Sequence, residues 1–131
     1  MKPMKKKILI VDDTPENIDF LVGILKDRYK LVAARDGSRA LKLANSNNPP
    51  DLILLDIVMP GMNGMEVFHM LKKSKQTSNI PVIFITGVSE EEHSHAEIAG
   101  RVDFIRKPFH AQIILQRVEI NLELSRYLTP V

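Results

Sequence analysis

The amino-acid sequence predicts an α/β fold in which five parallel strands form an open sheet with helices on both of its faces. Short runs of consecutive apolar residues alternate along the chain with longer segments whose apolar residues have helical spacing. Runs that are apolar at every position are typical of strands buried on both faces of a parallel sheet. The segments between them are long enough for the crossover helices that parallel strands require, and such crossovers are almost always right-handed.

Each expected strand is a short apolar run bounded by polar or turn residues. The first four are uninterrupted, whereas the fifth is weaker because it is shorter. In chain order they are residues 8–11, 31–34, 52–55, 82–85 and 104–105. We expect all of them to be buried within the sheet.

The first expected helix has the clearest start. Thr14 can cap it, and Pro15 takes the first helical position, where the missing N–H costs nothing. An apolar stripe with i, i+3, i+4, i+7 spacing then indicates one buried face. Its members are Ile18, Leu21, Val22 and Leu25.

Four more helices are expected, one after each of the remaining strands. The second opens at Asp36-Gly37-Ser38, and Asn63-Gly64 precedes the third. The weakest is a polar segment at residues 89–99, and the last covers about residues 110–128. The chain is therefore expected to repeat a strand and a helix five times, (βα)5.

Length and composition exclude several classes of protein. The chain has 131 residues, the size of one domain, and no cysteine, which excludes disulfides and thiol chemistry. The formal net charge is +2, and the basic residues are dispersed apart from Lys5, Lys6 and Lys7, which argues against direct nucleic-acid binding. No apolar run approaches the roughly 20 residues of a membrane helix. We therefore expect one cytoplasmic domain over residues 1–131, with no membrane contact.

Polar side chains follow four of the five expected strands. Asp12 and Asp13 come after the first strand, Asp56 after the third, Thr86 after the fourth and Lys107 after the fifth. In an open α/β sheet, ligands bind at the carboxyl ends of the strands. These five side chains are therefore expected to meet at one edge of the sheet.

Three carboxylates at one edge repel one another, so the cluster is expected either to be partly protonated or to hold a cation. A pair of them at 4 Å costs about 4 kcal/mol at an effective dielectric constant near 20. Oxygen ligands alone favour a hard cation such as Mg²⁺, and with Lys107 the formal charges then sum to zero. Such a site can accept a phosphoryl group, so the pattern suggests phosphoryl transfer with a carboxylate nucleophile.

The sequence resembles the receiver domain of two-component response regulators over about residues 5–125. The resemblance rests on Asp12-Asp13, on the stretch Asp-Ile-Val-Met-Pro-Gly-Met-Asn-Gly at 56–64, on Thr86, and on Lys107-Pro108-Phe109. It implies a flavodoxin-like sheet with the strand order 2-1-3-4-5. It also implies a signalling phosphoacceptor rather than an enzyme acting on a separate substrate.

The resemblance assigns roles to the acids. Asp56 would accept the phosphoryl group. Asp13 and Asp56 would bind Mg²⁺ (or Mn²⁺) directly, Asp12 would act through water, and the backbone carbonyl of Val58 would be a further ligand. Val58 and Val88 would flank the water that hydrolyses the product. Because neither can orient water, we expect slow self-dephosphorylation.

The resemblance also implies a switch. Thr86 would move toward the phosphoryl group, and Phe104 would fill the space that it leaves. Lys107 would supply the positive charge, and the Lys107–Pro108 peptide bond would be cis. The change would bias the surface formed by the fourth helix, fifth strand and fifth helix.

The partners follow from the same resemblance and from the last helix. The phosphoryl donor would be a phosphohistidine on a histidine kinase or phosphotransfer protein. The last helix has two apolar stripes, of which one can pack on the sheet and the other invites a helix from a dimer mate or a downstream output domain. The stripes are Ile113, Ile120, Leu124 and Tyr127, and Leu115, Val118 and Leu122. Residues 120–131 would then be an extension or linker.

Other functions fit the sequence less well. A phosphatase of the haloacid-dehalogenase type needs an Asp-x-Asp after the first strand, where this chain has Asp12-Asp13-Thr14. An FMN-binding flavodoxin should have a hydroxyl-rich phosphate loop there. A receiver that only binds partners would lack one of the acids or Lys107, and all are present.

Overall fold

The computed structural model describes residues 4–87, 102–108 and 110–128, and contains five strands and four helices within them. The elements are β1 (Lys7–Val11), α1 (Pro15–Leu25), β2 (Lys30–Ala34), α2 (Gly37–Ala44), β3 (Leu52–Asp56), α3 (Gly64–Lys73), β4 (Val82–Thr86), β5 (Asp103–Arg106) and α4 (Ala111–Leu128). The helix expected at residues 89–99 lies outside the described residues.

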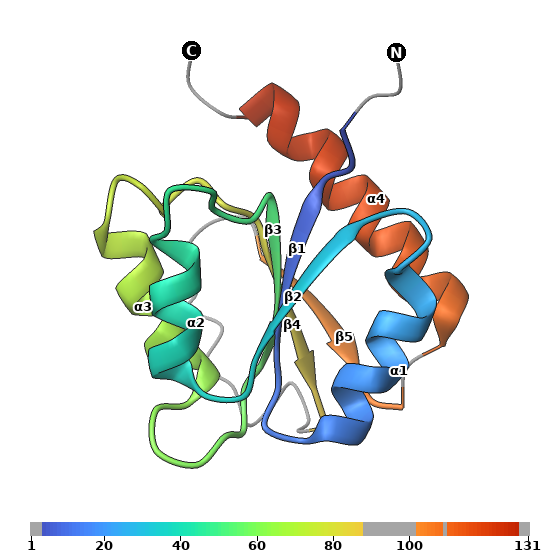
Figure 1. Cartoon of the computed structure of the whole chain (residues 1–131), viewed down its shortest axis with the longest axis horizontal. Coiled ribbons are helices and arrows are strands. Elements are labelled where there is room, and N and C mark those ends of the chain that lie inside the picture. Colours follow the sequence, from blue (N-terminus) through green and yellow to red (C-terminus); the bar gives the residue numbers. More distant parts are fainter. Residues whose placement is uncertain (1–3, 88–101, 109, 129–131) are drawn as a thin grey trace.

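The strands form one parallel sheet in the order β2-β1-β3-β4-β5. Helices α2 and α3 cover one face of the sheet, and α1 and α4 cover the other (Figure 1). An apolar core lies under each pair of helices, so the sheet separates two cores. The expected α/β class and strand order 2-1-3-4-5 are thus confirmed.

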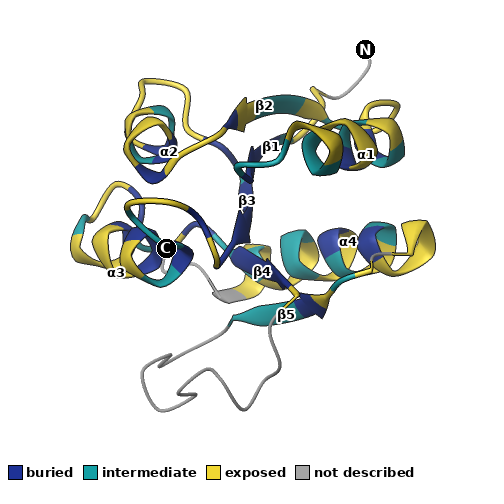
Figure 2. Ribbon diagram, turned by 90° about the horizontal axis from the view of Figure 1, so that it is seen from below, coloured by how far each residue is buried: buried dark blue, intermediate teal, exposed yellow. Residues whose placement is uncertain are grey.

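Like β5, whose Phe104 is half-buried, strand β2 differs from the expectation that every strand is fully buried. Its burial is incomplete, with Leu31 and Val32 half-buried and Ala33 exposed, whereas every residue of β3 and β4 is buried. The reason is its position: β2 lies at the edge of the sheet and pairs only with β1. The difference between central and edge strands is visible in Figure 2. An apolar run does not by itself distinguish these two environments.

The helices begin close to the predicted residues, but the predicted capping hydrogen bonds are not all formed. At α3, the Asn63 side chain accepts from the backbone N–H of Glu66, whose own side chain accepts from the N–H of Asn63. This reciprocal capping box fixes the start of the helix. At α1, by contrast, the Thr14 side chain makes no capping hydrogen bond. The backbone N–H of Asn17 already donates to the Thr14 carbonyl, so that helical donor is satisfied.

Helix α4 has one buried and one exposed apolar face. Ile114 and Val118 are fully buried in the core that lies between the sheet and helices α1 and α4, and Leu115 and Leu122 pack against this core. We call the exposed side chains Ile113, Ile120, Leu124 and Tyr127 the outer face of α4. Within the described residues, no helix is both long and apolar enough to cross a membrane.

Candidate functional site

Three carboxylates meet at the carboxyl edge of the sheet. Strands β1 and β3 are neighbours, so Asp12 and Asp13 after β1 lie beside Asp56 at the end of β3. One oxygen from each carboxylate lies within 4.8 Å of the others. Asp12 is 2% exposed and Asp56 is 4% exposed, while Asp13 is half-buried. We call these three residues the acid edge.

Lys107 reaches this edge from the loop after β5. Its ammonium nitrogen lies 3.7 Å from Asp12 Oδ2 and 3.6 Å from Asp56 Oδ1. The backbone N–H of Lys107 donates to the Thr86 carbonyl at 2.8 Å, and the Lys107–Pro108 peptide bond is cis. Lys107 is thus placed between two of the three carboxylates and offsets part of their charge.

The acid edge changes the protonation of Asp56. Burial raises its pKa to about 6, and the negative charges of Asp12 and Asp13 act in the same direction. The Lys107 ammonium and the backbone N–H of Val58 lower this pKa, but they do not cancel the effect of burial. The ionised form of Asp56 is therefore costly here even beside Lys107, and a bound cation would lower that cost.

A close backbone contact fixes the loop after Asp56. The N–H of Gly64 donates to the Ile57 carbonyl at 2.8 Å. A Cβ atom at Gly64 would collide with the backbone oxygen of Asp56. In the same loop Gly61 has a φ of +74°, in the left-handed region that glycine adopts without strain. The start of α3 therefore sets the position of the Asp56 backbone.

The expected switch residues lie next to this edge. Thr86 ends β4 and is 1% exposed. Phe104 on β5 is half-buried and stacks on Phe84 of β4, with the ring centroids 5.2 Å apart. Val58 is exposed at the rim. Val88, which was expected to lie opposite it, and Phe109, which follows Pro108, lie outside the described residues.

Two further side chains contact the acid edge that the sequence did not single out. The Asn17 amide donates to both Asp12 oxygens, at 3.2 and 3.4 Å. The Arg35 guanidinium donates to the backbone carbonyl of Asp13 at 3.2 Å. Arg35 directly follows β2, so applying the strand-end rule to the second strand as well would have found it. Asn17 left no comparable signal.

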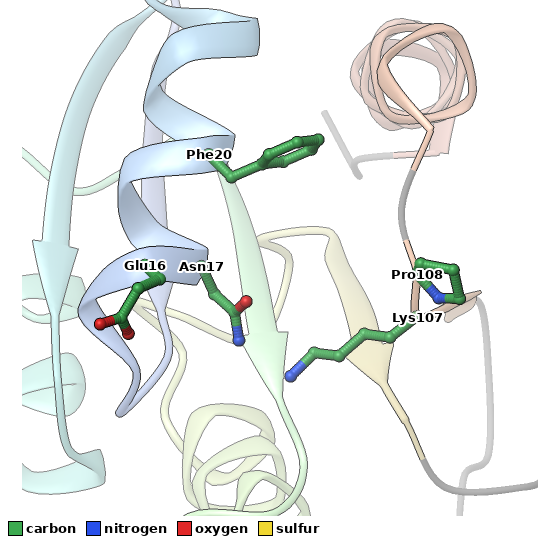
Figure 3. Close-up of a pocket in the computed structure, with 5 residues that line it drawn as sticks. All are labelled: Glu16, Asn17, Phe20, Lys107 and Pro108. Carbon is green, nitrogen blue, oxygen red and sulfur yellow. The ribbon is translucent and has the colours of Figure 1, made fainter.

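A groove adjoins the acid edge between α1 and the loop after β5. It has a volume of about 570 Å³ and is lined by Glu16, Asn17, Phe20, Lys107 and Pro108. Asn17 and Lys107 extend toward one another across it, while Phe20 forms its apolar side (Figure 3). The groove thus opens beside Asn17 and Lys107, two side chains that lie close to Asp12.

The donor set fits a hard divalent cation. All three acidic ligands offer oxygen, and their oxygens are close enough to contact one ion. Together with Lys107, a divalent cation would neutralise the three carboxylates. The raised pKa of Asp56 shows that its ionised form is unfavourable here, and a cation would favour that form. The arrangement can bind a cation and then a phosphoryl group beside it.

Comparison with known proteins identifies the family. The family model of the response regulator receiver domain matches residues 8–119. The chain belongs to this family. It is 35% identical over 118 residues to protein PilH of Pseudomonas aeruginosa, covering 88% of this chain and 97% of that protein. The receiver domain of a signal transduction histidine kinase from Syntrophus aciditrophicus superposes with a TM-score of 0.82 at 30% identity, covering 96% of both chains.

Another relative is much longer than this receiver domain. The chain is 45% identical over 121 residues to a probable cyclic di-GMP phosphodiesterase of Vibrio cholerae, covering 91% of this chain. It spans only 27% of that protein's length. Receiver domains of this family thus occur both as nearly the whole of a protein and as a small part of one.

Proposed function

We propose that this receiver domain accepts a phosphoryl group on Asp56 from a phosphohistidine of a histidine kinase or phosphotransfer protein. The observation that carries the proposal is the placement of Asp56, which is buried beside two further carboxylates and 3.6 Å from the Lys107 ammonium. A carboxylate in this setting can act as a nucleophile while nearby positive charge stabilises the phosphoryl group.

In the proposed reaction an Asp56 carboxylate oxygen forms a bond to phosphorus as the bond from phosphorus to the histidine nitrogen breaks. The histidine nitrogen keeps the electron pair of the broken bond. Because the other ring nitrogen carries a proton, the imidazole leaves as a neutral ring. Lys107 attracts a phosphoryl oxygen, and the groove beside it receives the imidazole. Bound Mg²⁺ (or Mn²⁺), held by Asp13, Asp56 and the Val58 carbonyl with Asp12 acting through water, would supply further charge neutralisation.

The same proposal includes the switch. Thr86 donates its hydroxyl to the phosphorylated Asp56, and Phe104 moves into the space that Thr86 leaves. Phe104 packs against the core under α2 and α3, whereas α4 covers the other face of the sheet, so the change would reach the expected surface through the movement of β5. The outer face of α4 and the linker at residues 120–131 connect the receiver unit, residues 5–125, to a second copy or to an output domain.

Intact-mass spectrometry with acetyl phosphate and Mg²⁺ tests the phosphoacceptor. We expect the wild type to gain one phosphoryl group, and Asp56→Asn to gain none. Asp27→Asn, which removes an exposed carboxyl group away from the acid edge, is the matched control and should behave as the wild type. Absence of the adduct in the wild type would contradict the proposal. Steady release of phosphate from added phosphate esters would instead favour a phosphatase.

A further inference from the structure

Asn17 occupies a position that neither helix formation nor core packing explains. It lies in the first turn of α1 and is half-buried. Its backbone N–H donates to the Thr14 carbonyl, so its side chain is not needed for capping. The side-chain amide instead lies 3.2 Å from Asp12 Oδ2 and 3.4 Å from Asp12 Oδ1. An amide shared by both oxygens restricts rotation of the carboxylate.

Two other groups among the described residues each lie close to one oxygen of Asp12. The backbone N–H of Thr14 donates to Oδ1 alone, at 2.9 Å. The Lys107 ammonium lies 3.7 Å from Asp12 Oδ2 and 3.6 Å from Asp56 Oδ1, so it attracts both carboxylates. Without the Asn17 amide, we expect the Asp12 carboxylate to rotate about its hydrogen bond with the Thr14 N–H and turn toward the Lys107 ammonium.

We propose that Asn17 is a positioning residue that orients the Asp12 carboxylate in the acid edge and thereby sets the affinity of the site for Mg²⁺. This inference rests on the proposed function, because it concerns the same cation site. Groups that orient a metal's ligands typically change metal affinity by about 10- to 100-fold when they are removed. Asp12 would act through water, so we expect the lower end of this range.

Asn17→Leu tests the inference, because leucine has a similar size but no donor and is a better helix former than asparagine. Phe20→Leu is the matched control, because it changes an apolar side chain that lines the same groove one turn further along α1. The measurement is an Mg²⁺ titration of the unphosphorylated protein, by calorimetry and by NMR shifts of backbone amides. Thermal unfolding of each variant checks that the fold is kept.

We expect Asn17→Leu to raise the Mg²⁺ dissociation constant about tenfold, and Phe20→Leu to leave it within twofold of the wild type. The Mg²⁺ concentration for half-maximal phosphorylation by acetyl phosphate should rise by the same factor, and the rate at saturating Mg²⁺ should recover. Asn17→Gln keeps the amide on a longer chain and should bind Mg²⁺ more tightly than Asn17→Leu does.

The outcomes separate this inference from the proposed function. An unchanged dissociation constant in Asn17→Leu overturns the inference while wild-type phosphorylation leaves the proposed function standing. Equal losses in the leucine and glutamine variants, or a lower rate that saturating Mg²⁺ does not restore, also overturn it. A wild type that neither binds Mg²⁺ nor accepts a phosphoryl group overturns both.

Discussion

The acid edge and the outer face of α4 depart from a typical protein surface in opposite ways. At the acid edge, carboxylates are buried beside one another, and burial holds the pKa of Asp56 near 6. On the outer face of α4, large apolar side chains are exposed, including Ile120 and Leu124. Neither arrangement favours the isolated chain, since buried like charges repel and exposed apolar area lies in water.

The difference between these regions concerns what each can receive. A small cation or phosphoryl group relieves repulsion between carboxylates, whereas only another apolar surface removes side chains such as Ile120 from water. The acid edge is therefore suited to binding a cation and a phosphoryl group, and the outer face of α4 is suited to contact with another protein surface. The variants below test this contrast, beginning with the largest expected effect.

Gly64→Ala should have the largest effect, because the new Cβ atom would collide with the backbone of Asp56. We expect the free energy of unfolding to fall by about 3 kcal/mol, as overpacking against backbone allows little relaxation. Gly23→Ala is the matched control. Nothing lies within 4 Å of its added Cβ, and alanine favours a helix by about 1 kcal/mol over glycine, so stability should rise. Urea unfolding measures both, and equal effects would contradict the close contact.

Ile114→Ala compared with Ile113→Ala tests the two faces of α4. Ile114 is fully buried, whereas Ile113 is 40% exposed on the outer face. We expect a loss of about 3 kcal/mol for Ile114→Ala, from lost burial and the cavity that remains. Ile113→Ala should cost less than about 1 kcal/mol in the monomer. Urea unfolding at low protein concentration measures both, and similar losses would mean that the helix is rotated from its position here.

Asp56→Asn tests the cost of the acid edge. The pKa of Asp56 is about 6 in the folded chain, above the ordinary value of 3.8, so its ionisation opposes folding. The neutral carboxyl group of Asp56 makes its full contribution to the free energy of unfolding below the ordinary pKa of 3.8, and this contribution is lost as the pH rises through about 6. Without divalent cations, Asp56→Asn should therefore be more stable than the wild type by about 2 kcal/mol at pH 8, with little difference at pH 3.5.

Unfolding curves across this pH range give the comparison. Asp27→Asn, at an exposed position, should change stability by less than about 0.5 kcal/mol throughout. Saturating Mg²⁺ should narrow the gap at pH 8, because it stabilises the ionised wild type. A gap that is constant with pH would show that the variant acts through packing rather than through the charge of Asp56.

The sequence predicted the acid edge more fully than it predicted the faces of α4. Parallel strands bring their carboxyl ends together whatever the details of packing, so Asp12 and Asp56 could be placed from the strand order alone. The rotation of α4 depends on tertiary contacts, and the adjacent residues Ile113 and Ile114 are the same amino acid. Their different burial could not be read from the chain.

A similar limit applies to single side chains and to edges. The position of Asn17 in the first turn of α1 was predictable, but the direction of its amide toward Asp12 depends on how the helix meets the strand. The incomplete burial of β2 depends on the absence of a second neighbouring strand among the described residues. In each case the missing information is a relation between elements rather than a property of one segment.

Val58→Asn should have the smallest energetic effect, and it is visible only in a rate. Val58 is 62% exposed at the rim, two residues after Asp56, and its side chain cannot orient a water molecule. An amide there can do so, and we expect faster hydrolysis of the Asp56 phosphate, by up to about tenfold, or about 1.4 kcal/mol of activation free energy. The decay of the phosphorylated mass after donor removal measures it. Met70→Asn, an exposed apolar residue on α3, should leave the rate unchanged. An unchanged rate in Val58→Asn would mean that water reaches the phosphoryl group by a route that does not pass this side chain.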